Sequence, residues 1–443
     1  MQRRISALAK GDAACERRAA RRFPDHLRML FSSLALPFLV GCVSTQRETP
    51  PPDAIRIGTV LPFSGERAAS GVALETAMRL AIEIVNSAQG MRGRQLWLDV
   101  RDSHSDATRG SANALALING EPIPFFIGTE EPTIAFQITT AIKSHQMVHL
   151  MPGLTSAQFH DPSAQAAWFR LSPSAGYIAC ALAKHMRAKG VNKANLVLDP
   201  DDYSGNFATA FDRTFHVNGG TVLPNINLGA GNGSFADVFS SLSRLSPDAT
   251  VLVTAPSVAA ALLQEWAVRG KPVKWYLGPP LNNPELLRNV PMGVLDGVQG
   301  VSADLGDRTS DFEMFFQQRT GVPTLAGSHN YFDAVVLLAL AVEEAIAQGG
   351  QFPAPLAVKN HMASVTSPGG TVVAFDQIPL AMSLLAAGQK IEYQGAAGFY
   401  VLSSLGDSTE NRGAIWEITG TQFTNVDYQM CNPAEVDSAA MPQ

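Results

Sequence analysis

Apolar residues follow two alternating spacings along this chain, and the alternation predicts strands followed by helices. Residues 55–61 (IRIGTVL) form a β-branched run of the kind that builds a buried strand. Apolar side chains then recur at every third or fourth position across residues 74–85, which is the period of one helix face. Further strands are expected at residues 96–100, 125–128 and 147–151, with helices between them. The pattern favours a parallel sheet covered by helices on both faces.

A second unit of the same kind follows residue 173. Its strands are expected at residues 195–198, 221–226, 250–254 and 273–277. Helical spacing fills the intervals between these strands. The remaining third is less regular, with an apolar helix at residues 332–347 and two late strands at 398–403 and 414–418. Two successive doubly wound units predict two α/β lobes that bind ligands near the carboxyl ends of their strands.

The first residues have the organisation of an export signal. Arginine-rich residues 17–28 precede a mostly apolar stretch, residues 29–41, that is too short to span a bilayer comfortably. The stretch runs into Leu39-Val40-Gly41-Cys42, which resembles the lipobox of bacterial lipoproteins. In that class the cysteine is acylated and the peptide before it is removed. The resemblance implies that residues 1–41 are a signal peptide and that Cys42 carries a lipid. An ordinary cleaved signal and a buried apolar helix are the alternatives.

Residues 42–53 are expected to be a tether between that lipid and the folded protein. The segment is polar and contains three consecutive prolines at 50–52, so it should be extended and semi-rigid. The protein is therefore expected at the periplasmic or extracytoplasmic face of a membrane, held there by its lipid. Val43 lacks the acidic side chain that often marks inner-membrane retention in Gram-negative lipoproteins, so an outer-membrane location is one alternative.

Composition narrows the class of partner. Charged residues make up 16% of the chain, hydrophobic residues 46%, and the net charge is −6. No basic cluster remains beyond the leader, so a nucleic-acid partner is not expected. No later apolar run is long enough to span a membrane. Cys180 and Cys431 could pair in an oxidising compartment, but two separate thiols, one buried and one in a tail, are the favoured interpretation.

Nothing in the sequence indicates catalysis. The chain lacks the Gly-x-Ser-x-Gly, His-Glu-x-x-His and Cys-x-x-Cys patterns of hydrolases, zinc proteases and redox proteins. His145 and His149 form one close pair, but they are expected at a helix end and in a strand, where they share no face. Residues 229–233 are glycine-rich without a following Lys-Ser or Lys-Thr, so a loop is expected there and not a phosphate site. No enzyme activity, cofactor or metal is expected.

Short motifs occur in the order found in one family. Residues 55–65 (IRIGTVLPFSG) resemble the first strand and first ligand loop of type I periplasmic binding proteins, in the branch that binds branched-chain amino acids for ABC importers. Later segments match that family in the same order, namely residues 81–86, 126–128, 152–156, 202–205, 234–235, 332–335 and 393–398. The resemblance covers residues 54–425. It implies a solute-binding lipoprotein that captures a small molecule and delivers it to the permease subunits of an ABC importer.

The family fold is an α/β structure of two doubly wound lobes joined by three crossovers, which close on a ligand. The resemblance implies a first lobe of residues 54–173 plus about 301–380. The second lobe is expected at residues 174–300 plus about 381–425, followed by a tail at 426–443. A regulatory or interaction lipoprotein, with the same fold and a vestigial cleft, is the alternative function.

The resemblance also implies a ligand cleft at the strand ends. Its expected residues are Ser64, Ser70, Thr133, Gly153, Leu154, Thr155, Tyr203, Ala255 and Pro280. Thr155 can donate and accept a hydrogen bond, the Gly153 carbonyl can accept one from the ligand, and Tyr203 can cover the pocket from the second lobe. Some of these residues also have a plain structural interpretation, with Thr155 as a helix cap, Tyr203 as a surface aromatic and Ser64 as part of a turn.

Several of these positions depart from the amino-acid-binding pattern. Pro132 stands where the family has a hydroxyl that binds the ligand carboxylate, with Thr133 beside it. Pro280 stands where the family has an acid that pairs with the ligand ammonium, and Ser70 and Ala255 replace aromatic residues. A buried ammonium without a carboxylate partner costs on the order of several kcal/mol. The expected ligand is therefore not a free amino acid but a larger or less polar molecule, or one with hydroxyls or a single carboxylate.

Overall fold

The computed structural model describes residues 49–155, 167–229, 235–402, 406, 411–431 and 435. The expected signal peptide, Cys42 and most of the tether lie outside the described residues, as do Ser234 and most of the glycine-rich loop. Within the described part of the chain, no helix is both long enough and apolar enough to cross a membrane.

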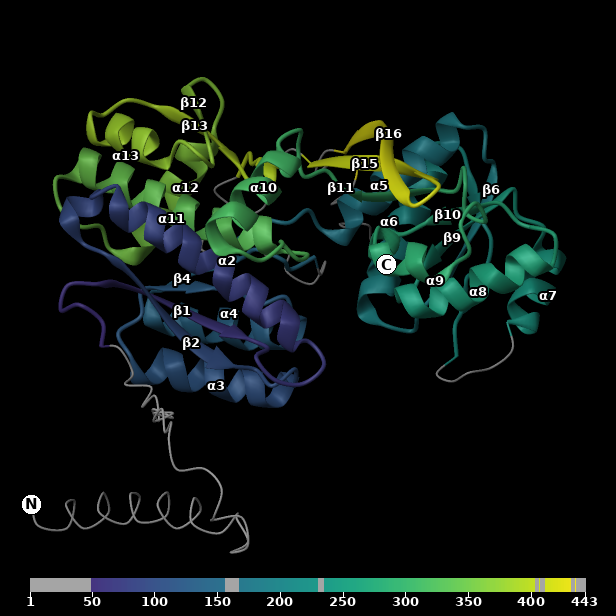
Figure 1. Cartoon of the computed structure of the whole chain (residues 1–443), viewed down its shortest axis with the longest axis horizontal. Helices are drawn as coiled ribbons and strands as arrows, with labels where there is room; N and C mark the ends of the chain where they lie inside the picture. Colours follow the sequence, from purple (N-terminus) through teal and green to yellow (C-terminus); the bar gives the residue numbers. More distant parts are fainter. Residues whose placement is uncertain are drawn as a thin grey trace, which may run out of the picture. The chain divides into compact units, whose positions relative to one another are not determined.

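The first sheet has five parallel strands in the order β2-β1-β3-β4-β5 (Figure 1). Its strands are β1 (Ile55–Leu61), β2 (Leu96–Asp102), β3 (Phe125–Ile127), β4 (Val148–Met151) and β5 (Trp168–Arg170). The helices that cover it are α2 (Ala68–Ser87), α3 (Ala107–Gly120), α4 (Pro132–His145) and α11 (Ser328–Gly349). Phe126 packs under α3 and α4 on one face, and Phe125 packs under α2 and α11 on the other. The two phenylalanines separate in this way because successive side chains of a strand point to opposite faces.

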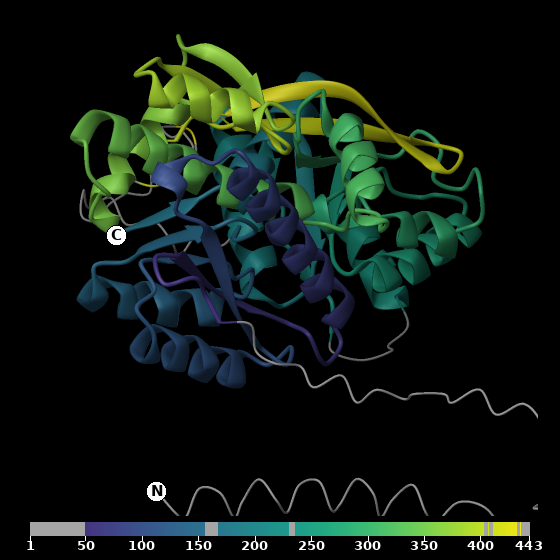
Figure 2. The same ribbon diagram turned by 60° about the vertical axis from the view of Figure 1, so that its left-hand side comes forward.

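The second sheet has the strand order β16-β15-β11-β10-β9-β6-β7, with β8 also paired to β6. Its strands are β6 (Lys193–Leu198), β7 (Thr221–Val222), β8 (Ile226–Asn227), β9 (Ala249–Val253), β10 (Trp275–Leu277), β11 (Gln299–Ala303), β15 (Asn411–Thr419) and β16 (Gln422–Cys431). Strands β6 to β11 are parallel, whereas β15 pairs antiparallel with β11 and forms a hairpin with β16 (yellow in Figure 2).

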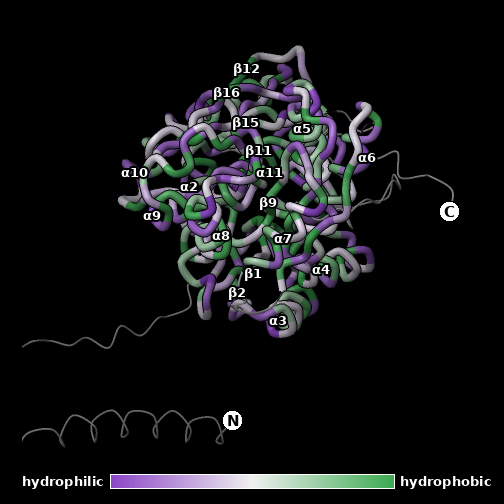
Figure 3. The backbone as a smooth tube through the Cα atoms, turned by 90° about the vertical axis from the view of Figure 1, so that its right-hand side faces the viewer, coloured by the Kyte–Doolittle hydropathy of each residue, from purple (hydrophilic) through white to green (hydrophobic). Residues whose placement is uncertain are grey.

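Two sets of helices cover the two faces of this second sheet. The first set is α5 (Ala175–Ala188) and α6 (Asp202–Val217), and the second is α7 (Ala236–Leu245), α8 (Pro256–Val268) and α9 (Pro284–Asn289). Hydrophobic residues concentrate on the inner strands, while the surface helices alternate between hydrophobic and hydrophilic positions (Figure 3). The two doubly wound units expected from the sequence are thus confirmed.

Further helices and a small sheet complete the first lobe. They are α10 (Thr309–Thr320), α12 (Val358–Thr366), α13 (Ile378–Ala386), β12 (Thr371–Ala374), β13 (Ile391–Gly395) and β14 (Gly398–Phe399). Three short 3₁₀ segments, η2 (Met91–Gly93), η3 (Pro279–Leu281) and η4 (Pro355–Ala357), lie in connections. Helix α11 is buried at every residue from Ser328 to Ile346 because it packs against α2, α12 and α13. Such enclosure accounts for a helix that is apolar on all sides.

The expected lobe boundary near residue 380 is wrong. Leu385, Ile391 and Tyr393 belong to the core of the first lobe, together with Leu402. They remain there because β13 pairs parallel with β12, and β14 turns back onto β13. The second lobe resumes at β15, and β16 ends at Cys431, so a tail can begin only after that residue and not at residue 426.

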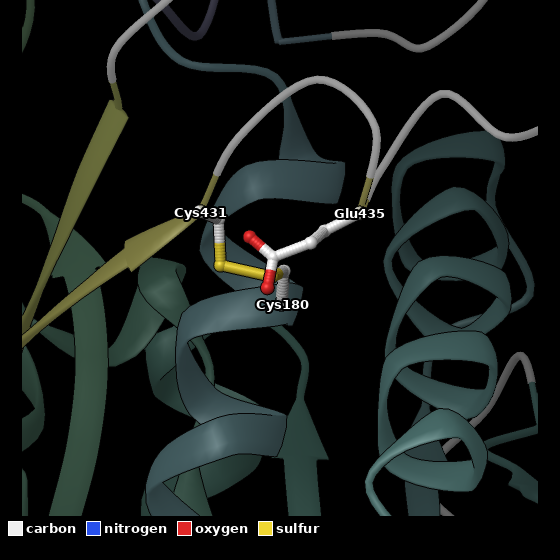
Figure 4. A group of neighbouring side chains, drawn as sticks. All are labelled: Cys180, Cys431 and Glu435. Carbon is white, nitrogen blue, oxygen red and sulfur yellow. A yellow bond between two sulfur atoms is a disulfide. The ribbon is translucent and has the colours of Figure 1, made fainter.

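Cys180 and Cys431 form a disulfide, so the expectation of two separate thiols is wrong. Cys180 is fully buried on α5, and Cys431 is the last residue of β16 (Figure 4). The two cysteines lie 251 residues apart in the sequence. They meet because the β15–β16 hairpin packs against α5.

Candidate functional site

The carboxyl ends of β1, β2 and β3 gather polar residues at one edge of the first sheet. Because these strands are parallel, the loops that follow them meet at that edge. A cavity of about 80 Å³ lies among the loops, with Tyr331 of α11 in its wall. Its polar lining includes Arg67, Ser105, Asp106, Thr129, Glu130 and Tyr331. This is the edge at which doubly wound folds bind their ligands.

An ion pair joins two of these loops. Arg67 Nη2 lies 2.8 Å from Glu130 Oε2 and so connects the loop after β1 to the loop after β3. Glu130 is held between Gly153 and Gly327, where a Cβ atom on either glycine would come within 2.7 Å of the Glu130 side chain. Burial raises the pKa of Glu130, although the positive charge of Arg67 opposes the shift. The Glu130 carboxylate therefore occupies a space that glycine leaves open on both sides.

Ser64 ties the loop after β1 to the loop after β2. Its hydroxyl lies 2.7 Å from Asp102 Oδ2 and 2.8 Å from His104 Nδ1, and the Phe63 N–H donates to Asp102 Oδ1. Burial acts to raise the pKa of Asp102, but the backbone N–H of His104 and the other donors outweigh it and lower the pKa. This geometry matches the turn-forming interpretation of Ser64.

Ser64, His104 and Asp102 do not form a catalytic relay. In a relay the histidine uses one ring nitrogen for the serine and the other for the acid. Here His104 Nδ1 faces both Ser64 Oγ and Asp102 Oδ2, the latter at 3.1 Å. The cluster therefore shapes two loops and has no arrangement for proton transfer through the imidazole.

The residues expected in the loop after β4 have different environments. Gly153 packs against Glu130, as described above. Leu154 is fully buried in a small cluster with Met151 and Trp168, so its side chain belongs to the core. Thr155 is half-buried, and its carbonyl accepts from the Ala175 N–H at 3.0 Å. Residues 156–166, where Thr155 could cap a helix, lie outside the described chain.

Two other expected residues of the first lobe lie in the first turns of helices. Ser70 is half-buried near the start of α2, and Thr133 is exposed at the second position of α4. Neither lines the cavity. Pro132 is the first residue of α4, where its lack of an N–H is tolerated.

The expected residues of the second lobe follow three adjacent parallel strands. Tyr203 lies in the first turn of α6 after β6, Ala255 precedes α8 after β9, and Pro280 lies in η3 after β10. Burial raises the pKa of Tyr203 above its usual range, so its hydroxyl stays protonated. Because β6, β9 and β10 are parallel neighbours, the three residues lie along one edge of the second sheet. No acidic side chain stands at the position of Pro280.

The sequence pattern does not single out Arg67 or Glu130. In the loop after β3 it directs attention to Pro132, where the family has a hydroxyl, and to the hydroxyl of Thr133. It does not direct attention to Glu130, the acid two residues beyond Gly128. An acidic residue in the loop after a buried strand is a usable signal, because strand ends at this edge face the ligand side. The contact with Arg67 cannot be read from the sequence, since the two residues are 63 positions apart.

A second cavity, of about 400 Å³, lies where the lobes are connected. Its lining includes residues 171–173 after β5 and residues 303–307 at the end of β11. It also includes residues 397 and 399–401 and Arg412, on either side of the last connection. Arg412 forms an ion pair with Asp304, which also lines the cavity. The chain segments at the two expected lobe boundaries, 173/174 and 300/301, thus lie beside one cavity.

Within the described residues, one group of residues of the types that bind metals is engaged in other contacts. Cys180, Cys431 and Glu435 lie close together (Figure 4), but the sulfurs are joined in a disulfide and offer no thiolate. The Glu435 carboxylate is 2.9 Å from Lys184 Nζ. His149 is fully buried, its pKa is lowered to about 4 by burial, and its ring contacts the Gly128 carbonyl. The neutral His149 ring is therefore part of the core.

Comparison with known proteins identifies the family of this chain. A family model described as periplasmic binding protein matches residues 54–382. The Leu/Ile/Val-binding protein homolog 3 of Brucella melitensis is 23% identical over 48% of this chain. The matched stretch covers 56% of that relative, so the chain spans little more than half its length.

Several solved structures have a fold similar to that of this chain. A branched-chain amino acid ABC transporter protein from Rhodospirillum rubrum matches with a TM-score of 0.66 and 21% identity, covering 84% of this chain and 100% of that one. A leucine-binding protein from Thermotoga maritima matches with a TM-score of 0.66 and 17% identity, covering 86% and 100%. A solute-binding protein from R. palustris in complex with benzoate matches with a TM-score of 0.65 and 18% identity, covering 85% and 96%. The family consists of solute-binding proteins of transport systems and not of enzymes. This chain belongs to the periplasmic binding protein family, and its fold is similar to that of solved branched-chain amino acid and leucine binding proteins.

Proposed function

We propose that this chain captures a small molecule other than a free α-amino acid between its two lobes and delivers it to an ABC importer. The family supports solute binding outside the cytoplasm as the general role. The ligand class rests on the residues at the strand ends, because these residues meet the solute in such folds.

The main support for this ligand class is the presence of proline at two positions. These are the positions that would bind the carboxylate and the ammonium of an amino acid. Pro132 begins α4 without an N–H or a hydroxyl to offer a carboxylate. Pro280 lies in η3 without an acid to pair with an ammonium. In addition, the Glu130 side chain, paired with Arg67, occupies the space beside Gly153.

The fold by itself does not decide the ligand. Neighbouring structures of similar fold include a Desulfitobacterium hafniense protein in complex with leucine and R. palustris proteins in complex with benzoate and 3,4-dihydroxybenzoic acid. Amino acids and aromatic acids are therefore both accommodated by this architecture, and loop residues must distinguish them.

We also propose that Cys42 is the first residue of the mature protein and carries its lipid anchor. The support is the Leu39-Val40-Gly41-Cys42 sequence and the proline-rich tether that follows it. A lipid at Cys42 would hold the binding lobes next to the membrane that contains the importer.

A thermal-shift screen of the purified protein against a metabolite library tests the proposed function. A compound that binds the folded state at about 100 times its Kd stabilises the protein by about 2.7 kcal/mol, which raises the melting temperature. We expect shifts from compounds outside the common amino acids. Stabilisation by amino acids alone would contradict the ligand class. No shift from any compound would favour the alternative of a regulatory lipoprotein with a vestigial cleft.

A further inference from the structure

The Glu130 carboxylate in the cavity at the edge of the first sheet is only half satisfied. Its Oε2 atom accepts from Arg67 Nη2 at 2.8 Å, while Oε1 has no hydrogen-bond partner among the residues that the structure describes. The side chain lies deep between two glycines but keeps 21% of its exposure, so a small molecule can reach it. An acceptor that lies at the floor of a concave surface with one oxygen free is open to a donor from outside the protein.

We propose that Glu130 and the Tyr331 hydroxyl form a subsite for a ligand group that donates a hydrogen bond, a hydroxyl or an ammonium, and that the subsite rejects carboxylates. The proposal rests on the proposed function, because it assumes that this edge of the first lobe meets a small solute. It adds the chemical class of the ligand's head group and the residue that selects it.

Tyr331 supplies the second, independent observation. Its side chain is fully buried in α11, yet its hydroxyl has no partner within the described structure and lines the same cavity. Most buried polar groups are hydrogen-bonded, so an unpaired hydroxyl beside a cavity marks a place for a partner. Burial raises the pKa of Tyr331 well above its usual value, which keeps the proton available for donation. A ligand hydroxyl can accept from Tyr331 while it donates to Glu130.

The charges around the cavity favour the same class of ligand head group, a hydrogen-bond donor. The lining contains three carboxylates, on Asp106, Glu130 and Glu131, and one guanidinium, on Arg67. Asp106 already accepts from the Arg109 N–H at the start of α3, and Arg67 is committed to Glu130. An anion would face the free oxygen of Glu130 at close range, whereas a neutral or cationic donor would complete its hydrogen bonds.

The two glycines indicate that the position of the carboxylate is built into the fold. A Cβ atom on Gly327 would come within 2.7 Å of Glu130 Oε1, and one on Gly153 would come equally close. Gly327 also has a φ of +87°, a conformation that side chains rarely adopt. The absence of a side chain at both glycines thus leaves room for the carboxylate.

Matched compounds that differ in one head group test the inference. We would titrate the whole protein with benzylamine, benzyl alcohol and benzoate, and with butylamine, butanol and butyrate, by ligand-observed NMR and calorimetry. The variants are Glu130→Gln, Tyr331→Phe and the control Glu75→Gln, an acid on α2 that pairs with Arg79 and lies outside the cavity lining. Melting curves of all variants verify that each protein is folded.

The wild type should bind the amine and the alcohol of a series more tightly than the carboxylate. Glu130→Gln should weaken amine binding by about 10- to 100-fold, the range of one charge-assisted hydrogen bond, and should improve carboxylate binding. Tyr331→Phe should weaken alcohol binding without lowering the melting temperature, because it removes a hydroxyl that has no partner within the described structure. Glu75→Gln should change neither the binding of the amine nor the binding of the alcohol.

Two results would overturn the inference and leave the proposed function intact. One is tighter binding of the carboxylates than of the amines and alcohols, which would make Arg67 the recognising group. The other is unchanged amine binding by Glu130→Gln. Absence of binding by all six compounds also contradicts the inference, and the thermal-shift screen then decides separately whether the protein binds solutes at all.

Discussion

At the scale of single residues, Asp333 is a buried polar group of the first lobe with every carboxylate oxygen engaged. It is fully buried on α11, and its carboxylate accepts four hydrogen bonds. Tyr393 and the Ala396 N–H donate to Oδ1, and the Ala397 N–H and Tyr400 donate to Oδ2, each at 2.8 Å. The four bonds fix the turn between β13 and β14 against α11. This turn lies just before the last connection to the second lobe.

Asp333→Asn should destabilise the protein even though it preserves size. Either orientation of the amide places its NH₂ group against a backbone N–H, from Ala396 or Ala397, which cannot reverse. One buried donor then stays unpaired, at a cost of about 1–3 kcal/mol. Urea denaturation should show the loss, and Tyr400→Phe, which removes one donor and leaves no clash, should cost less. Equal stability of wild type and Asp333→Asn would contradict this account of the turn.

The residue scale is also where the sequence is least informative. An apolar helix at residues 332–347 is predictable from its composition, but the four donors that meet Asp333 come from residues 60 to 67 positions away. Glu130 escapes prediction for the same reason, since its partner Arg67 and its neighbouring glycines are distant in the chain. Spacing patterns report which face of an element is buried; they do not report which loops meet.

At the scale of elements, the β15–β16 hairpin depends on its attachment to α5. The Cys180–Cys431 disulfide closes the end of β16 onto that helix. Cross-linking residues so far apart restricts the unfolded chain strongly, and removing such a bond typically costs about 2–5 kcal/mol. The Cys180→Ser, Cys431→Ser double variant should therefore unfold at lower denaturant concentration. The wild type under reducing conditions is the matched comparison. If neither the variant nor the reduced wild type unfolded at a lower denaturant concentration, this would contradict the disulfide between Cys180 and Cys431.

The same hairpin carries a pH-dependent contact. Asp427 Oδ2 of β16 lies 2.8 Å from His185 Nδ1 of α5. Burial acts to raise the pKa of Asp427, but hydrogen bonds from His185 and other donors outweigh it and lower the pKa below its ordinary value. An acid with a lowered folded-state pKa stabilises the protein above its unfolded pKa, and this contribution is lost as the pH falls through the folded pKa. Chemical denaturation between pH 7 and pH 3 should show a smaller loss of stability for Asp427→Asn than for the wild type.

The elements themselves are largely predictable, because their apolar periodicity is strong. Most parallel strands and covering helices of both lobes lie where the spacing places them, but β5 and β11 are not predicted by it, and the expected strand at 221–226 is two short strands, β7 and β8. The lobe boundary near residue 380 is not predictable from the sequence, because the composition of β13 would suit a strand of either sheet. Its pairing with β12 is a tertiary contact. The disulfide is not predictable because no local signal connects α5 to β16.

At the scale of the whole molecule, processing at Cys42 should determine where the protein works. Intact-mass measurement of protein extracted from its native membrane should show a chain that starts at residue 42 with an added lipid mass. Cys42→Ala should retain the signal peptide or release the protein from the membrane. A native chain that begins at Met1, or an unmodified Cys42, would contradict the proposed anchor.

Calorimetric titration with leucine, isoleucine and valine tests most directly whether this binding protein has lost the groups that hold a free amino acid. Each lost charge-assisted hydrogen bond weakens binding by about 1.5–3 kcal/mol, or one to two decades. With Pro132 and Pro280 at the two positions, a micromolar site should fall to a Kd of about 1 mM or weaker. A Kd below roughly 10 μM for any of the three would contradict the loss of these groups.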